Sequence, residues 1–225
     1  SRTVRVGAFF DVDKTILSEN SGTLYLRYLY RQGELTKIDL VKGIANYLQY
    51  KLNILDIERW TKETVKGLAG QEESRMIDFG RKFFDEMVRR TIYPDARRVI
   101  DDHFKKEHVV AIVSGATRYL VDPLCKELGI EHALLTRLEV DEGKFTGKVI
   151  DPINFGEGKV LGLREFVKRH RIDLAKSYFY TDSVSDLPLL DVVGHPRVVN
   201  PDPLLYRKAI GRRWPVTLFR TSVSL

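Results

Sequence analysis

Two aspartates, Asp11 and Asp13, follow an apolar segment near the start of the chain. The segment from Val4 to Phe10 is typical of a buried strand in a parallel sheet. Such sheets bind ligands at the carboxyl ends of their strands, where both acids would lie. Two neighbouring carboxylates repel each other, and a divalent cation relieves this because hard cations prefer carboxylate oxygens. The pattern therefore predicts a magnesium site with Asp11 as nucleophile.

Polar residues also follow two later apolar segments. Ser114 and Gly115 come after residues 108–113, and Asp182 comes after residues 177–180. In an open α/β sheet, the carboxyl ends of neighbouring strands converge on one crevice. These residues are therefore expected beside the first two acids, where Asp182 would supply a third carboxylate.

Lys159 follows Gly156 and Gly158 at the start of an apolar helical pattern. The N–H groups and the dipole of a helix start favour an anion, and the ammonium adds a full positive charge. Lys159 is therefore predicted to bind phosphate. A turn, a helix cap or a solvated side chain could explain each of these polar sites singly. Their joint occurrence at one sheet edge favours catalysis.

The chemistry requires a framework, and the apolar pattern predicts an α/β fold with a Rossmann-like parallel sheet covered on both faces. Asp95 is expected to cap one helix, and Asp122 is expected to cap another with Pro123 in its first turn. A longer helix from Thr117 with the proline inside it is the alternative. Residues 138–149 predict a hairpin.

A long helical segment separates the first strand from the rest of the sheet. It predicts an inserted all-helical domain at residues 16–92, and residues 1–15 and 93–225 form the core domain. The stripe that includes Trp60 is interpreted as the core of this insert, with a cofactor contact as the alternative. The apolar positions at helical spacing are Val41, Ile44, Ala45, Leu48, Leu52, Ile57, Trp60, Leu68, Met76, Phe79, Phe83, Phe84 and Met87.

Composition limits the location and the partners. Cys125 is the single cysteine, so no internal disulfide is expected and a cytoplasmic location is predicted. No apolar run approaches the roughly 18 residues of a membrane-spanning helix. The net charge of +6 could favour anionic substrates or partners, but a solvated surface is the preferred explanation. Basic clusters lie on separate predicted helices, so nucleic-acid binding is not expected.

The order Asp11-x-Asp13-x-Thr15, Ser114, Lys159 and Asp182 to Asp186 resembles the four motifs of the haloacid-dehalogenase-like phosphohydrolases. The helical insert directly after the first motif is similar to that of the phosphoserine-phosphatase-like branch, subfamily IB. The resemblance covers the chain outside the insert. It implies a parallel sheet core, and the insert would form a cap over the active site.

The resemblance also implies a magnesium-dependent phosphomonoester hydrolase that forms an aspartyl-phosphate on Asp11. Mg²⁺ would be held by Asp11, by the backbone carbonyl of Asp13 and by Asp182, while Asp186 would orient a metal-bound water or Lys159. The Asp13 carboxyl would protonate the leaving alcohol and then take a proton from the attacking water. A raised pKa is expected for this group.

For the transferred phosphoryl group, the resemblance implies hydrogen bonds from Ser114 and from the Gly115 N–H. Lys159 would offset the charge of the phosphoryl oxygens. Thr15 is expected to fix the loop. The substrate would be a small phosphorylated metabolite.

Two positions depart from the phosphoserine-phosphatase pattern. Asn20 stands where those enzymes usually carry a glutamate that binds the substrate ammonium, and Ser185 stands where they carry an asparagine. Phosphoserine is therefore not predicted as the substrate. A phosphotransferase with the same intermediate is one alternative function, and a non-catalytic phospholigand-binding module is another. Retention of Asp11 and Asp13 favours an enzyme.

Overall fold

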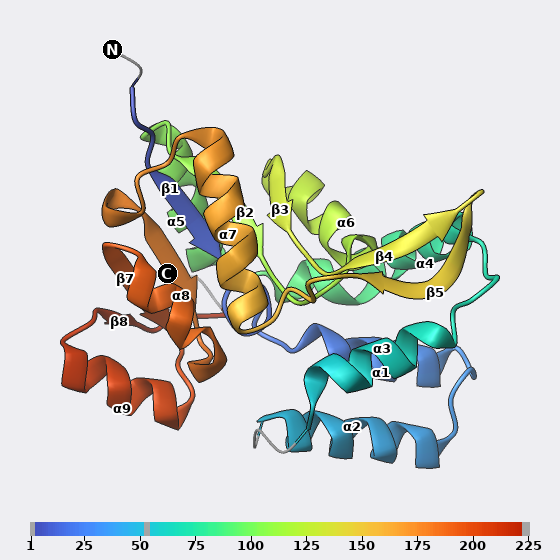
Figure 1. The fold of residues 1–225 in the computed structure, drawn as a ribbon. Coiled ribbons are helices and arrows are strands. Elements are labelled where there is room, and N and C mark those ends of the chain that lie inside the picture. The colour runs from blue at the N-terminus through green and yellow to red at the C-terminus, as the bar shows by residue number, and fades with distance from the viewer. Residues whose placement is uncertain (1–2, 52–54, 222–225) are drawn as a thin grey trace.

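The computed structural model describes residues 3–51 and 55–221. In this part of the chain, six parallel strands form one sheet in the order β3-β2-β1-β6-β7-β8 (Figure 1). The expected Rossmann-like parallel sheet is thereby confirmed. The strands are β1 (Gly7–Phe10), β2 (Val109–Val113), β3 (His132–Leu134), β6 (Tyr178–Thr181), β7 (His195–Val199) and β8 (Val216–Thr217).

Helices cover both faces of this sheet because its central strands are apolar on both sides. Along β1, Ala8 and Phe10 contribute to one buried cluster and Phe9 contributes to the other. The first cluster includes residues of α5 (Pro94–Lys105) and α6 (Arg118–Leu128). The second includes residues of α7 (Glu157–His170), α8 (Leu187–Val192) and α9 (Pro203–Arg212). Figure 1 accordingly shows α7 in front of β1 and α5 behind it.

The segment after β1 folds into helices that lie beyond the carboxyl ends of the strands (Figure 1). Its two connections to the sheet run together: the Ser18 N–H donates to the Thr91 carbonyl at 2.7 Å, and the Tyr93 N–H donates to the Ile16 carbonyl at 2.9 Å. One position of the predicted pattern, Leu52, lies outside the described residues. The elements are α1 (Ser21–Arg31), α2 (Lys37–Lys51), α3 (Ile57–Lys66), α4 (Glu73–Phe83), a π-helical turn η1 (Phe84–Val88) and a 3₁₀ turn η2 (Arg89–Thr91).

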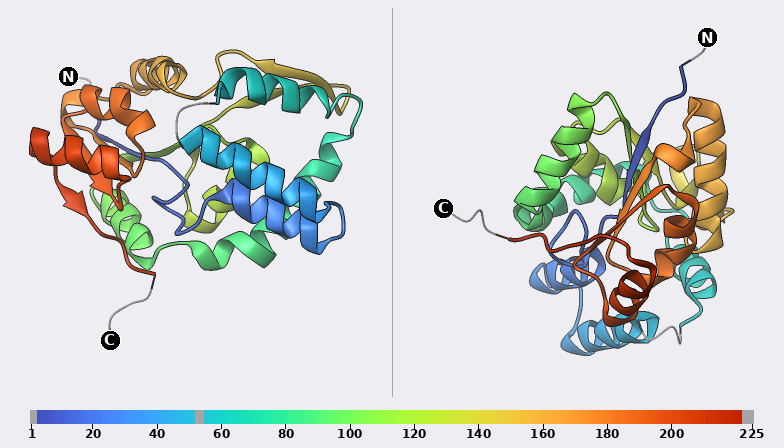
Figure 2. Two further views of the ribbon diagram at one scale, coloured as in Figure 1. Left: turned by 90° about the horizontal axis from the view of Figure 1, so that it is seen from below. Right: turned by 90° about the vertical axis from the view of Figure 1, so that its left-hand side faces the viewer.

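Helix α2 does not bury the apolar stripe that the sequence assigns to the core of the insert. It lies beside α1 (Figure 2), and Gly43 is so close to Leu26 that an added Cβ would lie 2.5 Å from the leucine Cδ1. This contact uses a different side of α2, and Val41 remains 65% exposed. Trp60 of α3 is 42% exposed. The interpretation of Val41 and Trp60 as buried core is therefore wrong, whereas Phe83, Phe84 and Met87 of the same predicted pattern are buried.

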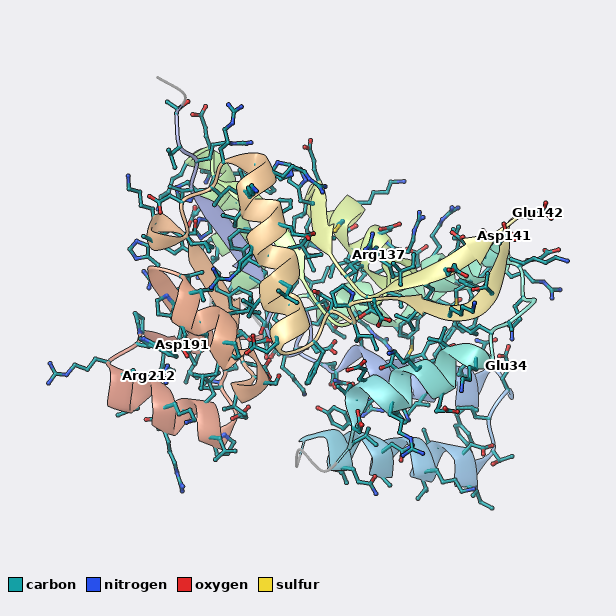
Figure 3. All side chains as sticks on the ribbon, in the orientation of Figure 1. Glu34, Arg137, Asp141, Glu142, Asp191 and Arg212 are labelled. Atoms are coloured by element: carbon teal, nitrogen blue, oxygen red, sulfur yellow. The ribbon has the colours of Figure 1, made fainter. Side chains whose placement is uncertain are left out.

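The predicted hairpin is present, and it pairs with the insert rather than with the main sheet. Strands β4 (Arg137–Asp141) and β5 (Lys144–Ile150) are joined by Glu142 and Gly143, which both have positive φ, as tight hairpin turns require. Figure 3 shows Asp141 and Glu142 at its outer tip. The Gly70 N–H donates to the Phe145 carbonyl at 2.8 Å. The hairpin therefore packs with the helical insert, although the predicted domain boundaries assign it to the core domain.

Two predicted helix starts differ in the structure. Tyr93 is the residue before α5, while Asp95 lies in its first turn and accepts hydrogen bonds from Arg98 and Arg220. The proline at position 94 explains this earlier start, because proline suits the first helical position. Helix α6 runs from Arg118 through Pro123, so the alternative with an internal proline is confirmed.

The internal proline has a packing partner in α4. Pro123 lacks an N–H, so the Tyr119 carbonyl loses the donor that would normally lie four residues later. Gly80 of α4 lies directly against this carbonyl, and a Cβ at Gly80 would be 2.1 Å from the carbonyl oxygen. Contact with backbone leaves little room for adjustment, so only glycine fits this crossing.

None of the helices within residues 3–51 and 55–221 combines the length and the apolar character needed to cross a membrane.

We expect Gly80→Ala to lower the free energy of unfolding by about 1–3 kcal/mol, because the added methyl group overpacks the contact between α4 and α6. Urea titration followed by circular dichroism measures the change. Gly211→Ala is the matched control, since a Cβ there meets no heavy atom within 4 Å and alanine favours a helix. Equal stability of the two variants would contradict the close approach at Gly80.

Candidate active site

Asp11 lies at the carboxyl end of β1, in the middle of the sheet. Its backbone N–H donates to the Tyr180 carbonyl of β6 at 3.0 Å, which continues the pairing of the two strands. The side chain is buried. Burial raises the pKa of Asp11 to about 7, Lys159 opposes this rise, and the charges of Asp186 and Asp13 add to it. A positively charged partner therefore stabilises the ionised form of Asp11.

Lys159 is the positive partner that the structure supplies. It lies in the first turn of α7, and its Nζ is 2.8 Å from Asp186 Oδ1 and 3.4 Å from Asp11 Oδ1. All three side chains are buried. The other oxygen of Asp186 accepts a hydrogen bond from Thr181 Oγ1 at 2.8 Å. Asp186 therefore orients the ammonium toward Asp11.

Asp182 lies directly after β6, beside the end of β1. Its Oδ1 is 3.5 Å from Thr15 Oγ1, a long hydrogen bond that links it to the first loop. The Asp182 carbonyl accepts from the Asp202 N–H at 2.9 Å. The carboxylate of Asp202 accepts from the N–H groups of Val184 and Leu205. Asp202 thus caps α9 and fixes the loop that carries Asp182.

Ser114 and Gly115 follow β2, on the other side of β1. The Ser114 N–H donates to the Leu134 carbonyl of β3 at 2.9 Å, and its Oγ accepts from the Ala116 N–H at 3.1 Å. The backbone of this turn is therefore fixed on both sides. A Cβ at Gly115 would lie 3.4 Å from the Asn154 carbonyl oxygen, so the loop before α7 packs against this turn.

Asn154 is a site-supporting residue that sequence reasoning missed. It is buried, and its Nδ2 donates to the Ser114 carbonyl at 2.7 Å and to the Leu134 carbonyl at 2.8 Å. One side chain thereby joins the loop that leads to Lys159 with the turn after β2. A polar residue five positions before the lysine was the available signal, but its partners are distant in the sequence.

Asp13 lies at the entrance to the helical insert, at the start of α1. Its Oδ1 accepts from the Ser21 N–H at 2.8 Å, and its Oδ2 accepts from Asn20 Nδ2 at 3.2 Å. Sequence reasoning marked Asn20 only as a departure from a family pattern. The structure shows that it contacts the second aspartate of the site.

The charges of the site suit a hard cation. The predicted residues comprise four aspartates, namely Asp11, Asp13, Asp182 and Asp186, against the ammonium of Lys159. A buried excess of carboxylate is costly unless it is compensated, and oxygen ligands are those that Mg²⁺ prefers. In the part of the chain that the structure describes, no three His, Cys, Asp or Glu side chains form a metal-binding group. Asp11 and Asp182, which follow the neighbouring strands β1 and β6, are the residues whose carboxylates could hold such a cation.

Comparisons with known proteins identify a family and relatives for this chain. A family model described as haloacid dehalogenase-like hydrolase matches residues 8–191. A probable phosphatase of Mycobacterium tuberculosis is 33% identical over 224 residues, which cover 98% of this chain and 78% of that protein. A histidinol-phosphatase of Neisseria meningitidis is 30% identical over 221 residues, which cover 95% of this chain and 98% of that protein.

Among solved structures, a phospho-aspartyl intermediate analogue of phosphoserine phosphatase is 22% identical, with a TM-score of 0.69 over 96% of this chain and 94% of the other. That likeness concerns the fold. The fold and the family match together define a hydrolase with a parallel α/β core. This chain belongs to the haloacid dehalogenase-like hydrolase family.

We expect Lys159→Met to destabilise the metal-free protein by about 3–5 kcal/mol, because the variant leaves buried carboxylates without a cation. The loss of Lys159 raises the pKa of Asp11 beyond about 7. A raised pKa stabilises the fold at low pH, and this contribution is lost as pH rises through the folded-state pKa. The loss of unfolding free energy in Lys159→Met, relative to the wild type, should therefore be larger at about pH 8 than at about pH 5.5.

Thermal unfolding in EDTA at the two pH values measures this difference. Lys62→Met is the matched control, because Lys62 pairs with Glu58 and Asp151 at the exposed surface of α3 and should have little effect at either pH. A deficit for Lys159→Met that does not change with pH would contradict the charge coupling.

Proposed function

We propose that this hydrolase is a Mg²⁺-dependent phosphomonoesterase that acts through an aspartyl-phosphate on Asp11. The observation that carries the proposal is the buried contact of Lys159 with Asp11 and Asp186, at distances of 3.4 and 2.8 Å. An ammonium directed at a buried carboxylate, beside the N-terminus of a helix, suits a phosphoryl group. The phosphatase names of the relatives support the same reaction class.

In the proposed reaction, an Asp11 oxygen attacks phosphorus in line and the ester bond to the alcohol breaks. Water then attacks the aspartyl-phosphate, which releases inorganic phosphate and restores the carboxylate. Bound Mg²⁺, held by Asp11, Asp182 and the Asp13 carbonyl, would supply charge neutralisation for both anions. The raised pKa of Asp11 makes such neutralisation necessary near neutral pH.

The other residues bind the phosphoryl group and move protons. Ser114 and the Gly115 N–H donate to phosphoryl oxygens, and Lys159 offsets the charge that develops on them. Asp13 gives a proton to the leaving alcohol and later accepts one from the attacking water. Lys159 is held in place by Asp186, whose second oxygen is already bound by Thr181.

We further propose that residues 16–92 act as a cap that excludes water and contacts the substrate. The substrate is a small phosphorylated metabolite. Histidinol-phosphatase among the relatives supports this size class. Asn20, at 3.2 Å from Asp13, is neutral and offers no charge to a substrate ammonium, so the proposal does not extend to phosphoserine.

We expect hydrolysis of p-nitrophenyl phosphate to require added Mg²⁺, to stop in EDTA, and to fall by more than about a thousandfold in Asp11→Asn, because the nucleophile is lost. Release of p-nitrophenol and of inorganic phosphate measures the reaction. Equal amounts of the two products, with acceptor alcohol present, distinguish hydrolysis from phosphoryl transfer.

Asp141→Asn is the control for this test, since Asp141 lies at the exposed end of β4, far from the site (Figure 3). It should retain the full rate. Hydrolysis that persists in EDTA, or that survives Asp11→Asn, would refute the proposed mechanism.

A further inference from the structure

Helix α1 lacks an acidic residue in its first turn, and Asp13 supplies one from outside the helix. The N–H groups at a helix start are unpaired and carry partial positive charge, so a carboxylate is favourable there. The Ser21 N–H donates to Asp13 Oδ1 at 2.8 Å. The Asp13 carboxylate therefore pairs with an N–H group at the start of α1 and also belongs to the candidate active site.

The intervening loop brings Asp13 to this position. The Val12 carbonyl accepts from the N–H groups of both Ile16 and Leu17, at 2.9 and 3.0 Å. Lys14 has a φ of 60°, so the chain turns sharply between β1 and α1. This tight turn places the Asp13 side chain under the first residues of the helix.

Asn20 is the residue that completes the contact, and its amide has one consistent orientation. Its Oδ1 accepts from the Thr23 N–H at 3.0 Å, which caps α1. Its Nδ2 therefore faces Asp13 Oδ2 at 3.2 Å. Reversal of the amide would place oxygen against carboxylate and N–H against N–H. The cap of α1 thus directs a donor at the second oxygen of Asp13.

We infer that Asn20 is a positioning residue for the acid–base carboxyl of Asp13. This inference rests on the proposed function, in which Asp13 protonates the leaving group. A carboxyl that transfers a proton must be held within hydrogen-bond reach of the ester oxygen. The Ser21 N–H and the Asn20 amide hold the two oxygens of Asp13 from one helix end. Its orientation is therefore set by α1.

The inference also assigns a function to the departure at this position. A glutamate at position 20 could bind a substrate ammonium, but it would place a second negative charge beside Asp13. Asparagine carries no charge, and it donates a hydrogen bond to Asp13 instead. The position therefore serves the proton transfer rather than the binding of a substrate ammonium.

The dependence on the leaving group tests this role. Phenolate, whose conjugate acid has a pKa of about 10 as in tyrosine, needs a proton to leave, whereas p-nitrophenolate is a weak base and leaves without one. We expect Asn20→Asp to lower kcat/KM for phenyl phosphate by about 10–100-fold and that for p-nitrophenyl phosphate by less than about threefold. Aspartate retains the helix cap, so the fold is preserved.

Asn20→Ser is the second variant, because serine also caps a helix and removes the donor to Asp13 without a new charge. It should show the same selective loss. Thr23→Val is the matched control: it removes the 2.9 Å bond from Thr23 Oγ1 to the Asn20 carbonyl in the same turn and should leave the ratio of the two rates unchanged.

Equal losses on both esters in Asn20→Asp and Asn20→Ser would overturn the positioning role and leave a structural one. A wild-type enzyme that hydrolyses neither ester would instead refute the proposed phosphatase activity, and the inference with it. The two failures are therefore distinguishable.

Discussion

The buried contact between Lys159 and two aspartates is the interaction on which this site depends. An isolated charge in such a position is costly, and opposite charges with good geometry offset the cost. Asp186 is the nearer partner and is itself bound by Thr181. Removal of Lys159 would leave both buried carboxylates, Asp11 and Asp186, without a cation. The ammonium is therefore the group on which this contact depends.

Sheet topology brings the members of this contact together. Asp11 follows β1, and Asp182 and Asp186 follow β6, which is its direct neighbour in the sheet. Ser114 follows β2 on the other side of β1. Because all these strands are parallel, their carboxyl ends share one edge. Residues that are more than 100 positions apart in the sequence therefore lie close together at this edge of the sheet.

Much of this could be predicted from the sequence because it depends on local patterns. Apolar runs that end in polar residues gave the strands and the positions of Asp11, Ser114 and Asp182. Contacts between distant segments were not predictable in this way. In the sequence, Asn154 is an ordinary loop residue. Only the structure shows that it contacts β3 and the turn after β2. The prediction of buried positions was wrong at Val41 and Trp60 for the same reason. Helical spacing identifies an apolar face but not the element that packs against it.

Helix starts were less accurate where two signals competed. At Asp95, the acidic residue suggested a cap, while the preceding proline favoured a start two residues earlier. At Pro123, the cap pattern was plausible locally, but α6 continues through the proline, and Gly80 lies against the carbonyl that the proline leaves without a helical donor. A local proline signal decided the first case, whereas in the second the structure shows a tertiary contact beside the internal proline.

This approach of α4 to α6 has a mechanical consequence for the insert. Backbone contact allows little sliding, so the insert is held rigidly to the core at α4. Helix α2 lies at the far edge of the molecule (Figure 1) and contacts α1 through Gly43 and Leu26. A rotation about the α4 contact would therefore displace α2, whose apolar residues face solvent, farther than it would displace α4.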